Sequence, residues 1–493
     1  MSKDTKKSFF DLFRKERRAE VPKTADRFCT DEPEEAEKPI KQEPEAVSYG
    51  LSEVQALYLY GLNRKNPGEI VPPHICFELK YPHLDAKRLE RAILQVLHRH
   101  PMMHTAFGIN HTQMVLPLPD TFHLDVTACE PEALRETLDR QWEAVCEPSY
   151  RPKDGNLFTI RLTNCGEESY IDSSVALLTA DWSSIYNLVR DTEQAYLDPE
   201  SLTERLPLNY SQFVTYEEKK RRTLEYMKDN AYWEDRMNSL CDAPKLPVRE
   251  AETENGDHNA FRQYSMMLSR DEWDHLRQMG EKKGFSPRSL LMSAYADALA
   301  AWSDNKSFAL QLIMLKRPDM GYGTRELVGN FASHILIHAD RSAGKTFVDG
   351  NRQIKQAIFE GVEHKSFSAI ALMKRMKEEG KRTGLIPYVF TDMLGLMDSE
   401  TGTVHSELTR YMIREIPQVY INCQAFDGKD GLGLHWDIRK DLFADEVADG
   451  LFASFEGLIR ALCVDPSAWD FRDMLLDFSG QAGTRRFSAS DCG

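Results

Sequence analysis

The sequence predicts a mixed α/β or α+β protein that is built as two lobes. The chain has 493 residues, whereas a single hydrophobic core rarely grows beyond roughly 250–300 residues. Both halves alternate between apolar stretches with a period of two and longer stretches with a helical period. Strands and helices that alternate in this way favour sheets covered by helices. We expect an N-terminal lobe over residues 47–215 and a C-terminal lobe over 216–480.

Composition and charge exclude several classes of partner. The formal net charge is −16, which argues against nonspecific binding to nucleic acid or to an anionic membrane. The nine cysteines form no C-x-x-C pair, so we expect reduced thiols and a cytoplasmic location. No apolar run approaches the roughly 20 residues of a membrane span, and no metal site is predicted.

The first 46 residues are expected to lie outside the globular part. Residues 8–18 combine a capping-box pattern with one apolar and one basic face, so they form either a docking helix for a partner protein or a frayed tail. Residues 21–46 are acidic and proline-containing, a composition that buries no core. Residues 481–493 form a polar tail, which we also expect to be disordered.

In the first lobe, residues 51–58 and 85–99 have helical patterns, and residues 75–80 and 157–162 have strand patterns. Pro101 ends the second helix, so His100 before it is predicted to be structural. The apolar run 175–178 resembles a buried strand that stops before Asp181. Asp181 stands where it can cap the following helix.

A charged stretch, residues 217–222, is expected on a solvated helix that joins the two lobes. Strands are predicted at 261–268 and 308–315, with a helix at 273–282 between them. Pro287 opens a strongly apolar helix, because its missing N–H is no loss in a first turn.

Short motifs along residues 47–475 resemble those of heterocyclization domains, which belong to the condensation-domain superfamily of nonribosomal peptide synthetases. They occur in the family's order and at plausible separations. The matching segments are 51–58, 99–102 with Phe107, 181, 231–236, 328–333, 387–392, 417–424 and 434–437.

The resemblance implies a fold and a set of partners. The family fold has two chloramphenicol-acetyltransferase-like lobes, which form a V with a tunnel along their seam. Partner proteins, either peptidyl or aryl carrier proteins or other synthetase subunits, deliver thioesters into it on phosphopantetheine arms. The chain itself is then expected to bind no cofactor, and residues 8–18 are the candidate docking segment.

The chemistry that the resemblance implies is amide formation followed by cyclodehydration. Thr391 and Gln424 match polar residues of the family site, and Asn422 stands where the family has a catalytic Asp. Ala176 replaces the first aspartate of the Asp-x4-Asp motif, and Asn330 replaces the aspartate of a Gly-Asp-Phe-Thr motif. A carboxamide has no usable pKa and can only donate or accept hydrogen bonds. We therefore expect condensation with impaired dehydration.

The expected structural frame of the tunnel consists of five residues: Asp181, Arg317, Ala176, Asn330 and Ser333. Asp181 matches the second aspartate of the core motif and is predicted to pair with Arg317 across the seam. Ser333 follows the second degenerate motif and is expected near the tunnel. Asp392 is a candidate replacement acid, although in an extended segment its side chain points away from that of Thr391.

Two hypotheses of different class follow from these departures. The chain is either a stand-alone condensation-type enzyme, in which proximity of two tethered thioesters supplies much of the rate, or a non-catalytic relative that binds and positions carrier proteins. An open tunnel favours the first hypothesis, and a tunnel filled by side chains favours the second.

Overall fold

The computed structural model describes residues 48–470, except 63–71, 109–110, 203–205, 250–260, 316, 343, 381–385, 396–405, 415, 417–418 and 429–430. The predicted docking segment 8–18, the acidic linker and the tail 481–493 lie outside the described residues. Within the described part of the chain, no helix is both long and apolar enough to cross a membrane.

The first large sheet has five strands in the order β12-β2-β7-β6-β5. Helices α2 and α4 pack together on one face, where apolar side chains of α2 join those of β2 in a common core. Helix α3 contacts β2, β6 and β7 on the other face. The bounds are β2 (His74–Pro82), β5 (Asp125–Ala128), β6 (Phe158–Cys165), β7 (Glu168–Ala176), β12 (Glu407–Arg414), α2 (Ala86–Arg99), α3 (Leu134–Cys146) and α4 (Trp182–Leu197).

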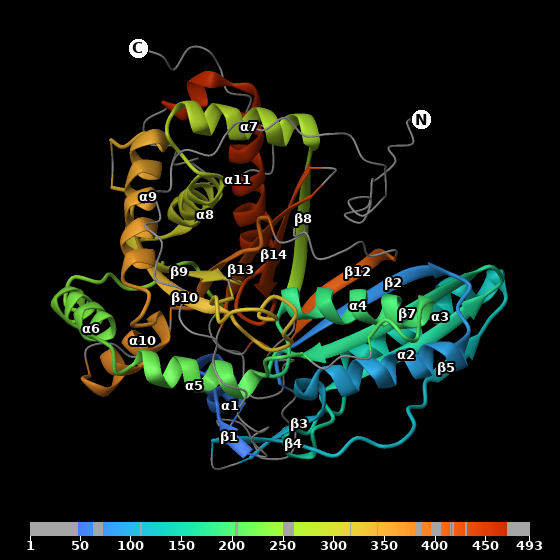
Figure 1. The fold of residues 1–493 in the computed structure, drawn as a ribbon. Coiled ribbons are helices and arrows are strands. Elements are labelled where there is room, and N and C mark those ends of the chain that lie inside the picture. Colours follow the sequence, from blue (N-terminus) through green and yellow to red (C-terminus); the bar gives the residue numbers. More distant parts are fainter. Residues whose placement is uncertain are drawn as a thin grey trace, which may run out of the picture.

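The second large sheet has six strands in the order β10-β9-β11-β13-β14-β8, and β11 runs parallel to both of its neighbours. Helices α7, α8, α9 and α11 gather on one side of it (Figure 1) and bury the larger of the hydrophobic cores. The bounds are β8 (Phe261–Ser269), β9 (Ser307–Met314), β10 (Ser333–Asp340), β11 (Tyr388–Asp392), β13 (Ile421–Gly428), β14 (Gly431–Arg439), α7 (Arg270–Lys282), α8 (Pro287–Trp302), α9 (Phe347–Glu363) and α11 (Asp445–Val464).

Smaller elements surround the two sheets. A three-stranded sheet has the order β1-β4-β3, and α5 and α6 carry the chain from the first large sheet toward the second (Figure 1). The bounds are β1 (Ser48–Gly50), β3 (Thr105–Phe107), β4 (Thr112–Val115), α1 (Glu53–Leu62), α5 (Tyr210–Lys220), α6 (Leu224–Arg236) and α10 (Ala369–Glu378).

Strand β12 crosses between the two halves of the fold. It comes from the second half of the sequence but pairs antiparallel with β2, at the edge of the first sheet. The division at residues 215 and 216 stays a prediction, and it did not anticipate this strand. Tyr411 and Ile413 of β12 therefore lie in the first sheet but face the same cavity as residues of β11 and β13 in the second sheet.

Most elements lie where the sequence predicted them, and the mixed fold class is confirmed. Asp85 caps α2 and Asp181 caps α4, each by accepting a hydrogen bond from a backbone N–H. Pro287 stands in the first turn of α8 behind the cap Ser286. The charged stretch 217–222 begins in the last turn of α5, a helix between the two sheets.

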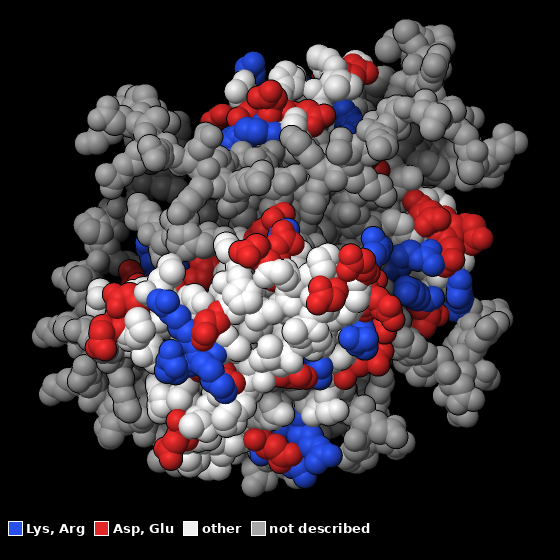
Figure 2. Space-filling view, turned by 90° about the vertical axis from the view of Figure 1, so that its right-hand side faces the viewer, with Lys and Arg blue, Asp and Glu red and all other residues white. Residues whose placement is uncertain are grey.

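Charged side chains are mixed on the face seen in Figure 2. Lysine and arginine lie next to aspartate and glutamate over the described part of that face.

Candidate functional site

A cavity that is partly open to solvent lies between the two large sheets. Strands β2 and β12 of the first sheet and β9, β10, β11 and β13 of the second contribute side chains to its wall. Successive residues of a strand face opposite sides. Thr391, Asn422 and Gln424 therefore face the cavity, whereas Phe390 and Cys423 pack into the core beneath the helices.

Thr391 and Asn422 form a hydrogen-bonded pair on this wall. The Thr391 hydroxyl donates to Oδ1 of Asn422 over 2.8 Å, and both side chains are buried. An aspartate in place of Asn422 would accept the same bond and would also carry a titratable carboxyl. Asn422 keeps the geometry and offers only its NH₂ group as a donor.

Gln424 links the cavity wall to a deeply buried acid. Its Oε1 accepts a 2.6 Å hydrogen bond from the Tyr411 hydroxyl of β12, and its Nε2 donates to Oδ2 of Asp437 over 2.5 Å. Burial raises the pKa of Asp437 to about 7, against the lowering effect of its amide donors Gln263 and Gln424. Asp437 is not among the residues of the cavity wall, so it holds Gln424 and does not face a substrate.

Asp181 has the structural surroundings that the sequence predicted. Its Oδ1 caps α4 by accepting from the N–H of Ser184, and its Oδ2 accepts from the N–H of Phe331. Arg317 Nη2 lies 3.6 Å from Asp181 Oδ1, an ion pair slightly longer than a hydrogen bond. Both side chains are more than nine-tenths buried, so each charge offsets the other. Asp181 also lies on the cavity wall.

The three remaining frame residues are placed differently. Asn330 lines the cavity, and its side chain donates to the carbonyl of Leu177 and accepts from the N–H of Ala332. Ala176 is fully buried at the end of β7, away from the cavity wall. Ser333 also lies off the wall and donates to the Met314 carbonyl over 3.4 Å. A carboxylate at position 176 would therefore be buried, whereas one at 330 would face the cavity.

Asp392 points away from the site, as the alternation of an extended strand predicted. Its carboxylate pairs with Arg288 of α8 on the helical side of the sheet. Its Oδ1 also accepts from the N–H of Leu394. Asp392 is therefore a structural residue in this arrangement and does not replace the acid that is absent at Asn422.

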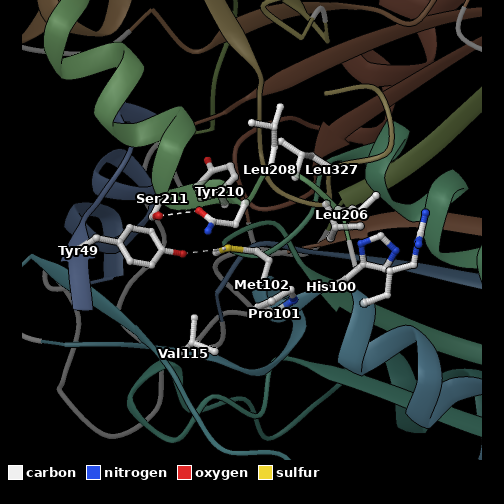
Figure 3. Close-up of a pocket in the computed structure, with 13 residues that line it drawn as sticks. Tyr49, His100, Pro101, Met102, Val115, Leu206, Leu208, Tyr210, Ser211 and Leu327 are labelled. Atoms are coloured by element: carbon white, nitrogen blue, oxygen red, sulfur yellow. Dashed lines mark hydrogen bonds between the residues drawn. The ribbon is translucent and has the colours of Figure 1, made fainter. Parts of the chain in front are cut away.

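His100 is structural, as predicted. Its Nε2 lies 2.8 Å from Oδ2 of Asp191, which Arg99 and Arg190 also contact, so the cluster joins α2 to α4. His100 also borders a smaller pocket beside Tyr49 and Met102 (Figure 3). That pocket lies outside the cavity between the two large sheets.

The cavity wall also includes Gln311, His334 and Tyr411, polar residues that the sequence analysis did not single out. A signal was present for Gln311, because it interrupts the apolar run of a buried strand. Among the described residues, no group of three or more His, Cys, Asp or Glu side chains is arranged to hold a metal ion.

Comparison with known proteins identifies the family. The family model of the condensation domain matches residues 46–479. The chain is 29% identical over 436 residues to pyochelin synthetase PchF of Pseudomonas aeruginosa, covering 85% of this chain and 24% of that protein. It is 26% identical over 438 residues to phenyloxazoline synthase MbtB of a Mycobacterium species, covering 86% of this chain and 36% of that protein.

A solved structure shares the fold. The cyclization-docking bidomain of the synthetase EpoB from Sorangium cellulosum superposes with a TM-score of 0.74 at 21% identity, covering 87% of this chain and 89% of that one. The chain therefore belongs to the condensation-domain family of nonribosomal peptide synthetases. It is similar to members of the heterocyclization type, and it spans only about a quarter to a third of these two curated relatives.

Proposed function

We propose that this chain condenses two thioester-bound substrates into an amide and that its capacity for the following dehydration is impaired. The observation that carries the proposal is the Thr391–Asn422 pair on the wall of an open cavity. The hydrogen-bonding frame is intact, but an amide occupies the position at which the related motif has a carboxylate.

Positioning of the two substrates can supply a large part of the rate of the first step. The amine of one substrate attacks the thioester carbonyl of the other, the C–N bond forms, and the C–S bond breaks. Holding two reactants together can supply about 7–11 kcal/mol of the barrier reduction. A cavity between the two sheets, partly open to solvent and lined by the Thr391–Asn422 pair, supports this role over that of a non-catalytic binding domain.

The second step makes a different demand. Closing a thiazoline or oxazoline ring expels the amide oxygen as water, so a group must give and take protons at that oxygen. The Thr391 hydroxyl can donate or accept a hydrogen bond, but its partner Asn422 cannot exchange a proton at working pH. Dehydration is therefore expected to be slow or absent.

The partners in this proposal are carrier proteins that bear phosphopantetheine thioesters, with residues 8–18 as the proposed docking segment. The names of the relatives suggest the first substrates to test, because a phenyloxazoline contains an aromatic acyl group and a ring made from a hydroxy amino acid. A benzoyl thioester is therefore the donor of choice, with a carrier-bound Cys, Ser or Thr as acceptor.

Intact mass spectrometry tests the proposal. A benzoyl-loaded carrier and a cysteinyl-loaded carrier are mixed with the chain, and the mass of the acceptor carrier is followed. The expected product carries the added benzoyl group with no loss of water. No product from any acceptor would contradict catalysis, and efficient loss of one water would contradict the impairment.

A further inference from the structure

His334 on β10 shares the cavity wall with Thr391. The strands are registered so that His334 stands opposite Ile313 of β9, and Ile313 stands opposite Thr391 of β11. Residues directly opposite one another face the same side of a sheet, and neighbouring strands lie about 4.8 Å apart. The backbones at His334 and Thr391 are therefore about 10 Å apart, on either side of one row of the wall.

The neighbours of His334 fix which ring nitrogen holds the proton. The Gln311 side-chain NH₂ group donates to the carbonyl of Ile386, so its Oε1 faces Nδ1 of His334 over 3.0 Å. A carbonyl oxygen only accepts, so Nδ1 carries the hydrogen. In the neutral ring the Nε2 atom then has a free lone pair.

The fold provides no hydrogen-bond donor to this Nε2 atom among the described residues. The atom is buried, and the side chain that bears it lines the cavity. His334 is only 7% exposed. Burial lowers its pKa to about 4, so the ring is neutral near pH 7. An unpaired acceptor in such a place is costly unless a ligand satisfies it.

We propose that His334 is a catalytic acid–base residue for the condensation that the chain is proposed to carry out. As the substrate amine attacks the thioester carbonyl, Nε2 takes the proton that the nitrogen loses when the C–N bond forms. When the C–S bond breaks, the imidazolium returns this proton to the departing thiolate. The histidine ends the cycle neutral, and no other reactant is needed.

The inference rests on the proposed function and explains how proton transfer survives the changes at Asn330 and Asn422. Neither of those amides can take a proton at working pH. An imidazole can, and the hydrogen bond from Nδ1 to Gln311 holds the His334 ring in place on the cavity wall.

Substitution with chemical rescue tests the assignment. In His334→Ala, the rate of amide formation between benzoyl and cysteinyl carriers should fall about 100-fold or more, the usual effect of removing a general acid–base group. Added imidazole should restore part of it. In His334→Gln the new side chain can still hydrogen-bond to Gln311, so this variant should fold normally. It should form amide as slowly as His334→Ala, and added imidazole should not restore its rate.

The control is His338→Gln on the same strand, where the ring contacts Ser307 and Cys241 away from the cavity. Its rate should match that of the unmodified protein. An unmodified chain that forms amide at a rate unchanged in both His334 variants would overturn the assignment while leaving the proposed function intact.

A second readout serves if the unmodified chain forms no amide, a result that would count against the proposed function itself. In ¹⁵N-histidine NMR, the Nε2 signal that disappears in His334→Gln should report a lone-pair nitrogen. It should shift when a hydrolysis-resistant seryl-pantetheine amide is added, because the amine of that probe reaches Nε2. An Nε2 that carries a hydrogen, or that does not respond to the probe, would overturn the assignment.

Discussion

The hydroxyl of Tyr411 on β12 donates a 2.6 Å hydrogen bond to Oε1 of Gln424 on β13. This bond joins the first sheet to the second at the cavity, and Trp182 packs against the Tyr411 ring with centroids 4.8 Å apart. The site is therefore assembled from both halves of the fold. Any change that loosens the contact between the sheets should also disturb the residues that face a substrate.

Tyr411→Phe should lower the free energy of unfolding by about 1–3 kcal/mol. The substitution removes the donor and leaves Gln424 Oε1 buried without it, and the cost of an unsatisfied buried group is of that size. Urea denaturation measures the change. The matched control is Tyr322→Phe, since Tyr322 is 90% exposed and its loss should alter stability by less than about 0.5 kcal/mol. Equal effects of the two substitutions would contradict a specific role for the bond.

Asp181→Ala should lower the free energy of unfolding by about 3–5 kcal/mol, because it leaves Arg317 buried without its acidic partner. It also removes the acceptor for the N–H groups of Ser184 and Phe331. Thermal and urea denaturation should both show the loss. The control is Glu378→Ala, which removes an exposed ion pair with Lys374 and should change the free energy of unfolding little. A small effect of Asp181→Ala would show that its surroundings relax or admit water.

Asp437 should make stability depend on pH. Its folded-state pKa of about 7 lies above its ordinary value, so the native protein holds a proton that the unfolded chain releases above about pH 4. This contribution to stability is therefore full below about pH 4 and is lost as pH rises to about 7. Its size is on the order of 4 kcal/mol, at 1.36 kcal/mol for each pH unit.

Comparison with Asp437→Asn isolates that contribution. Buried histidines such as His74, whose pKa burial lowers to about 4, contribute a slope of opposite sign in both proteins. The difference in unfolding free energy between the unmodified chain and the variant should therefore fall between about pH 4 and about pH 7. A difference that stays constant across that range would mean that Asp437 is ionised throughout it.

The sequence predicted those features that depend on local pattern. Alternation and capping located β8, α2 and α8, and the motifs marked Thr391, Asn422 and Gln424 as candidate site residues. The structure brings all three to one wall, because β11 and β13 are neighbouring strands. Long-range pairing was not predictable. Segment 407–414 was not among the predicted strands, and its local sequence does not indicate that it joins β2 at the edge of the first sheet.

Because long-range pairing could not be predicted, the sequence also did not show that His334 faces the cavity and that Ala176 does not. A polar residue in a buried strand signals that something compensates for it, but Gln311 becomes its partner only through the pairing of β9 with β10. Ala176 matched a motif position whose family residue is charged, yet here its side chain lies in the apolar core. Motif matching located positions along the chain, and only the fold shows which of them face the cavity.

Asn422→Asp should move the chemistry toward dehydration. The substitution is nearly isosteric, and the new carboxylate can accept the hydrogen bond that Thr391 now donates to Oδ1. It also adds a group that exchanges protons beside the cavity. With a benzoyl donor and a cysteinyl acceptor, the variant should form some product lighter by one water, where the unmodified chain forms the amide alone. Intact mass spectrometry of the acceptor carrier separates these products.

The controls for this substitution come from positions on and off the wall. Asn330→Asp adds a carboxyl that faces the cavity without contacting Thr391, and Asp392→Asn removes one that points toward α8. Neither should add dehydration, whereas Asn422→Asp combined with Thr391→Val should lose the gain. If Asn422→Asp folds and still yields only amide, the carboxylate is held protonated by burial, or the proton for ring closure comes from elsewhere on the wall. Measuring the ratio of dehydrated product to amide up to pH 9 separates these two explanations. If burial holds the carboxyl protonated, it ionises at high pH and dehydration rises; if another group supplies the proton, the ratio does not follow this ionisation.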